Sequence, residues 1–126
     1  MTALATLAGV HRGWAWVVIG GNAVAGLWAL GAHRWAQLRT PGLWWFTGAV
    51  EVAVFAQVIL GVAMVAGKSV RPDLKFHMLY GFSTIVAVGI LYSYRQQLRH
   101  RIYLLYGFGG LFLMGLGIRA WQVGPR

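Results

Sequence analysis

The sequence predicts an all-α integral membrane protein, folded as an antiparallel up-down bundle of four transmembrane helices. Of its 126 residues, 59% are hydrophobic and only 10% are charged. Soluble chains carry about 25% charged residues. A soluble domain this small would not hide so much apolar surface, because small domains bury a smaller share of their chain. We therefore expect a single transmembrane domain, residues 1–126, with the lipid bilayer as its solvent.

Four apolar stretches define the helices in order, each close to the roughly 20 residues that a spanning helix needs. Three short basic segments connect these stretches. RWAQLRTPG lies between the first and second stretches, KSVRPDLK between the second and third, and RQQLRHR between the third and fourth. A proline in each of the first two connections, Pro41 and Pro72, can stop or start a helix there without removing an internal hydrogen bond. Such short connections make consecutive helices antiparallel. The predicted spans are about 13–33, 43–67, 76–94 and 102–122.

The charge of the chain is strongly unbalanced, with eleven Lys and Arg against two acidic residues and a net charge of +9. In a soluble protein this would indicate nucleic acid. Here the basic residues lie between apolar stretches, as in loops that face anionic headgroups, so we expect no nucleic-acid partner. With no cysteine, disulfides, thiolate metal sites and c-type heme attachment are excluded. The first ten residues lack a basic start, so we expect no cleaved signal peptide.

Small residues recur at four-residue spacing, which places them along one helix face. Small faces let membrane helices approach closely, so we interpret them as packing surfaces. The glycines of the fourth stretch make it smooth enough to pack on a sister helix or a partner subunit. The residues concerned are Gly21, Ala25 and Ala29 in the first stretch, Ala49, Ala53 and Gly61 in the second, and Gly107, Gly109, Gly110, Gly115 and Gly117 in the fourth.

Four histidines are the main candidate ligands. In an up-down bundle His11 and His77 lie at one end, and His33 and His100 at the other. Two imidazoles on different helices at equal depth can ligate a heme iron from opposite faces. The alternative is interfacial histidines hydrogen-bonded to water and headgroups. We favour that alternative for His33 and His100, because His100 lies in an Arg-His-Arg cluster. His11 and His77 are the better candidates for heme ligation, although a histidine pair without a motif leaves both interpretations open.

The chain carries His11-Arg12 opening a helix, Gln57 within AQVILGVAMV, a short loop containing Pro72, and His77 opening the next helix. This pattern resembles one four-helix half of the heme A synthase family, over nearly the whole chain. The resemblance implies that His11 and His77 are the axial ligands of one b-type heme near the outer face of the membrane. It also implies an N-terminus outside. We accordingly expect a multi-pass protein of a bacterial cytoplasmic membrane.

The chain also departs from that family. Its catalytic half has a glutamate three residues before the histidine of the first motif, where this chain has Ala8. The cysteine pair of many bacterial members is absent, and only one half is present. We therefore expect heme binding without oxidation of a heme methyl group, and no autonomous enzyme.

Glu51 is the most informative single acid. It lies about two turns into the second stretch, where an ionised carboxylate costs several kcal/mol unless it is paired, hydrated or protonated. It either relays protons, on its own or for a partner, or fixes helix contacts as a protonated or arginine-paired group, with Arg34 or Arg101 in reach. Both interpretations stay open.

Three further polar residues need a role. Asp73 lies four residues before His77 and either hydrogen-bonds its imidazole or caps the helix that follows Pro72; we favour the cap. For Asn22 and Gln57 in mid-span, we expect hydrogen bonds between helices.

Two functions follow. The first is a small b-type cytochrome-like protein, with one heme between His11 and His77, that serves electron transfer or heme handling within a larger respiratory or photosynthetic complex. The alternative is a heme-free accessory subunit of a multi-subunit membrane complex. Both have the bilayer and other membrane subunits or a sister copy as partners. A solute transporter is weaker, because the chain has neither an internal repeat nor broken helices.

Overall fold

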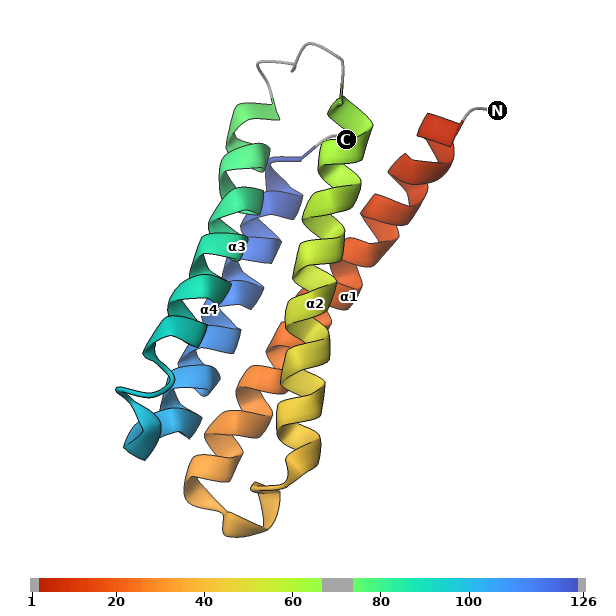
Figure 1. Cartoon of the computed structure of the whole chain (residues 1–126). Helices are drawn as coiled ribbons and strands as arrows, with labels where there is room; N and C mark the ends of the chain where they lie inside the picture. The colour runs from red at the N-terminus through yellow and green to blue at the C-terminus, as the bar shows by residue number, and fades with distance from the viewer. Residues whose placement is uncertain (1–2, 67–73, 125–126) are drawn as a thin grey trace.

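The computed structural model describes residues 3–66 and 74–124, and this part of the chain is helical and contains no strand. The long helices are α1 (Ala3–Arg34), α2 (Pro41–Val65), α3 (Lys75–Tyr94) and α4 (Ile102–Gln122), with the short turns η1 (Ala36–Leu38) and η3 (Arg99–Arg101) in two of the connections. All four long helices are long and apolar enough to cross a membrane. The all-α class is thus confirmed, with four candidate spans (Figure 1).

Helix α1 begins at Ala3, well before the expected start near residue 13. The preceding segment is rich in alanine and leucine, which are strong helix formers, so the helix continues through the polar pair His11-Arg12. His11 therefore lies inside a helix rather than at its entrance. By contrast, α2 begins at Pro41, where proline's fixed φ suits the first turn of a helix and its missing N–H is not needed.

Contacts between α1 and α2 run in reverse order along the two helices. The ring of His11 lies beside Gly61, and farther along α1 the ring of Trp28 packs on Phe46, with centroids 5.9 Å apart. Figure 1 shows the chain descending along α1, returning along α2, descending along α3 and returning along α4. The N- and C-terminal ends therefore lie at the same end of the molecule.

The most extensive helix contact is between α1 and α4, and glycines make it possible. A Cβ added to Gly110 would lie 2.8 Å from the Cα of Gly26, and one added to Gly26 would lie 2.9 Å from the carbonyl oxygen of Gly107. Backbones this close leave no room for side chains. The smooth face of α4 thus packs on a helix of its own chain, while Gly115 has open space.

The α2 and α3 helices make few contacts with each other, so other side chains fill the space between the two pairs of helices. At the end opposite the termini, Trp44 of α2 packs on Tyr103 and Tyr106 of α4, with ring centroids 5.6 and 5.4 Å away. At the end with the termini, Trp16 of α1 packs on Trp121 of α4, with ring centroids 4.9 Å apart, and a cavity lies among the four helices.

The two polar side chains in mid-span, Gln57 and Asn22, donate hydrogen bonds to backbone carbonyls, one in a neighbouring helix and one in its own helix. Gln57 of α2 donates to the carbonyl oxygen of His11 in α1, 2.8 Å away, which is the expected bond between helices. Asn22 instead donates to the carbonyl of Val18, 2.9 Å away in its own helix. The expected interhelical bond of Asn22 is therefore wrong: the tight approach of α4, whose Gly110 lies against the Asn22 carbonyl, leaves the amide its own helix as acceptor.

Candidate functional site

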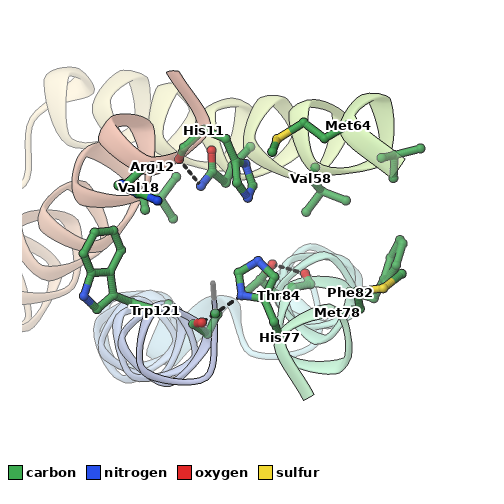
Figure 2. A pocket seen from close by; sticks show the side chains of 18 of the residues that line it. His11, Arg12, Val18, Val58, Met64, His77, Met78, Phe82, Thr84 and Trp121 are labelled. Atoms are coloured by element: carbon green, nitrogen blue, oxygen red, sulfur yellow. Dashed lines mark hydrogen bonds between the residues drawn. The ribbon is translucent and has the colours of Figure 1, made fainter. Parts of the chain in front are cut away.

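A cavity of about 480 Å³ lies among all four helices near the end that holds both termini. This volume falls within the range of small-molecule and cofactor sites. Its walls are mostly apolar, and His11 and His77 project into it from α1 and α3. Figure 2 shows the two imidazoles facing each other across the gap between the α1/α2 pair and the α3/α4 pair.

The spacing of these two imidazoles matches that of two ligands on one metal ion. Their ring centroids are 5.9 Å apart, and their planes are inclined by 85°. Because a metal–imidazole nitrogen bond is about 2 Å long, two imidazoles on opposite sides of one ion have ring centres roughly 6 Å apart. The inclination is compatible with ligation, since each ring can rotate about its own metal–nitrogen bond.

His77 is oriented by the backbone of α4. Its Nδ1 lies 2.8 Å from the carbonyl oxygen of Ala120. Because a carbonyl only accepts, Nδ1 is the donor of this hydrogen bond, which in a neutral imidazole leaves the lone pair on Nε2. Metal-binding histidines commonly donate their second nitrogen to such an acceptor. Gly124 gives the ring room, since a Cβ there would lie 2.9 Å from Nδ1. Asp73, the other candidate acceptor, lies outside the described residues.

His11 is held by α2. Gln57 donates to its backbone carbonyl, and the absence of a side chain at Gly61 lets the ring approach, since a Cβ there would lie 3.3 Å from Cε1. The buried Nδ1 of His11 and Oε1 of Gln57 have no hydrogen-bond partner among the described residues. Buried polar atoms without partners are rare and costly, so a bound group would complete this side of the cavity.

The protein ligands that this cavity offers limit which kind of metal site it can form. Within residues 3–66 and 74–124 there is no group of three or more His, Cys, Asp or Glu side chains arranged to hold an ion. A structural zinc site needs four protein ligands, which this pair does not supply. A heme needs only axial ligands from the protein, because its macrocycle supplies the other four nitrogens.

Several lining residues were not predicted from the sequence. The Ala120 carbonyl and Gly124 position His77, and the thioethers of Met64 and Met78 also line the cavity, as does the cationic Arg12. Counting helical rise from the connections places all of them near the depth of the histidines. This depth is the signal that would have found them, although it does not show which side of a helix faces inward.

The remaining candidate residues lie elsewhere. His33 and His100 are exposed, and neither lines the histidine cavity. Glu51 of α2 is also outside it, in the half of the molecule that holds Trp44. Among the described residues, Glu51 forms no ion pair with Arg34 or Arg101.

No family model, no curated protein and no solved structure matches this chain. The geometry of the cavity and of its two histidines is therefore what indicates a function.

Proposed function

We propose that the four helices form an antiparallel transmembrane bundle and that the bundle binds one b-type heme between His11 and His77. The observation that carries the proposal is the 5.9 Å separation of the two imidazole centroids inside an apolar cavity. Helical bundles build cofactor sites in this manner, from side chains on facing helices. The length and apolar composition of the helices support insertion in the bilayer.

The cavity fits heme b in its chemistry as well as in its spacing. The apolar walls match a flat hydrophobic macrocycle. Among the described residues, Arg12 is the one Lys or Arg in the lining, and it suits the propionate groups because a guanidinium binds a carboxylate through two parallel hydrogen bonds. The resemblance to the heme A synthase family points to the same two histidines.

Each part of the site has a role in this proposal. His11 and His77 would hold the iron through ring nitrogens that are free of protons, while the Ala120 carbonyl and Gln57 hold the two histidines in place. The apolar walls exclude water. When bound, heme supplies one-electron redox chemistry, whose potential depends on the axial ligands and on burial.

With both His11 and His77 holding the iron, no position would be left on it for a substrate, which favours electron transfer over chemistry on a substrate. Ala8 lines the cavity and offers no carboxyl group for acid–base catalysis. We propose that the protein passes electrons or hands on heme as part of a larger respiratory or photosynthetic complex in a bacterial cytoplasmic membrane. Other membrane subunits or a second copy would be its partners.

The direct test is the visible spectrum of protein purified in mild detergent from heme-replete cells, first oxidised in air and then reduced with dithionite. We expect a Soret band, α and β bands that sharpen on reduction, and one heme per chain by pyridine hemochrome. A flat spectrum that hemin does not restore would overturn the proposal and leave the heme-free accessory subunit. Metal analysis that finds copper without heme would also overturn it, since Met64 and Met78 add soft ligands to the cavity.

A further inference from the structure

A second group of polar side chains, Thr47, Glu51 and Tyr106, lies in the half of the bundle opposite the histidines. Their side-chain oxygens form no hydrogen bond among the described residues. The hydroxyl of Thr47 on α2 is buried without a partner, in a side chain only 8% exposed. Glu51, one helical turn later on the same face of α2, forms neither a hydrogen bond nor an ion pair among the described residues. The phenol of Tyr106 on α4 also lacks a hydrogen bond within that part of the chain.

Tyr106 connects this group to the end of the molecule. Its phenol interacts electrostatically with Glu51 on α2 and with Tyr92 and Arg95 at the end of α3. Arg95 stacks 3.6 Å above the ring of Tyr92 and donates to the Tyr92 carbonyl, 2.7 Å away. Arg95 is therefore engaged at the helix end and does not neutralise Glu51.

Within residues 3–66 and 74–124, no other charged side chain forms an ion pair with Glu51. Between Arg12 and His33, α1 carries no ionisable side chain, and between Arg101 and Arg119 the only ionisable groups of α4 are Tyr103 and Tyr106. An unpaired carboxylate in hydrocarbon costs several kcal/mol. A protonated carboxyl avoids this cost, and a water molecule fits a polar site that offers it two to four partners.

We propose that Thr47, Glu51 and Tyr106 form a proton-binding site around a shared water molecule. The bound proton is held by the Glu51 carboxyl and exchanges with water at the membrane surface beside Arg95. The Glu51 carboxyl donates to the water, and the water and the Tyr106 phenol satisfy the Thr47 hydroxyl. On release, the carboxyl and a water at that surface become a carboxylate and a hydronium ion. The site is independent of the histidine pair and of any heme.

Infrared spectroscopy tests this proposal directly, because Glu51 is the only glutamate and Asp73 the only aspartate in the chain. Glutamate labelled with ¹³C at its side-chain carboxyl shifts the Glu51 band without any mutation. In the full protein at neutral pH, we expect a carboxylic-acid C=O band that moves on labelling, is absent in Glu51→Gln and persists in Asp73→Asn. If only the carboxylate band moves on labelling, Glu51 is ionised and the proposal is wrong.

Two variants test the shared water. Thr47→Val and Tyr106→Phe remove one hydroxyl each and keep the shape of the side chain, so we expect both to shift the labelled C=O band to higher frequency. Tyr106→Phe should also slow hydrogen–deuterium exchange of that band. Tyr103→Phe is the matched control, because Tyr103 packs on the same Trp44 but is not among the electrostatic partners of Tyr106. An unshifted band in both test variants would overturn the proposal.

Discussion

At the scale of single residues, the two histidines are held by different elements, and this predicts the effects of their replacement. In the proposed heme site, His11→Ala and His77→Ala would each remove one of the two residues that hold the iron, so we expect each variant to lose the low-spin Soret and α bands of the purified protein. His33→Ala is the control, because His33 is exposed at the other end, and it should retain the full spectrum. If the His33 variant loses the bands while the His77 variant keeps them, the ligand assignment is wrong.

Gly124 offers a subtler test of how His77 is oriented. In Gly124→Ala the added Cβ would lie 2.9 Å from Nδ1, so the ring must turn away from the Ala120 carbonyl. Loss of such an orienting contact commonly lowers metal affinity by about 10–100-fold. We expect a loss of this size in the hemin affinity of the variant, measured by titrating protein depleted of heme. Gly115→Ala is the control on α4, and equal hemin affinity in both variants would contradict the role of Gly124.

At the scale of helices, the α1–α4 contact depends on close approach of the two backbones. In Gly110→Ala the new Cβ would lie 2.8 Å from the Cα of Gly26, and backbone gives way less readily than a side chain. Overpacking of this kind costs about 1–3 kcal/mol. We expect Gly110→Ala to lower the free energy of unfolding by that amount, measured by circular dichroism as the protein unfolds in detergent mixtures.

The same helix provides the control for that measurement. Gly115 has nothing within 4 Å of an added Cβ, and alanine restricts the unfolded chain more than glycine does. Gly115→Ala should therefore leave stability unchanged or raise it slightly. Destabilisation of both variants to the same extent would mean that the α1–α4 contact does not explain the effect, because the higher helix propensity of alanine favours the folded state at both positions.

At the scale of the whole molecule, labelling of single introduced cysteines can test the topology of the proposed bundle. The chain has no cysteine of its own, so only the introduced residue reacts. Lys75, replaced by cysteine in one variant, lies near the end with the termini. Gln97, replaced in the other, lies in the connection between α3 and α4 at the opposite end. With the N-terminus outside, a membrane-impermeant maleimide should label Lys75→Cys in intact cells. It should label Gln97→Cys only after permeabilisation.

Each other result of the labelling experiment has a distinct meaning. The reverse pattern would invert the proposed orientation and keep the bundle. Labelling of both positions from the same side would contradict a four-span antiparallel topology. Membrane insertion is thus tested separately from heme binding.

Much of the architecture could be predicted from the sequence, because hydropathy is averaged over consecutive residues and does not depend on which helices pack together. The all-α class and four long apolar helices follow from it. The start of the first helix was misplaced, since the polar pair His11-Arg12 ended the apolar stretch but not the helix. Alternation of helix direction also places His11 and His77 at one end, although their distance is a tertiary property.

The sequence by itself determined the helical class, the apolar spans, the basic connections and the candidate ligands, all properties of residues and their order. Only the tertiary structure decided how each helix is rotated about its axis. That rotation brings the two imidazoles to 5.9 Å and makes the Ala120 carbonyl the acceptor for His77. It also turns Gly107, Gly110 and Gly117 of α4 onto α1 and leaves Glu51 without a charged partner among the described residues. The physical reason is that rotation depends on packing between helices distant in the chain, and the hydropathy of one helix does not encode it.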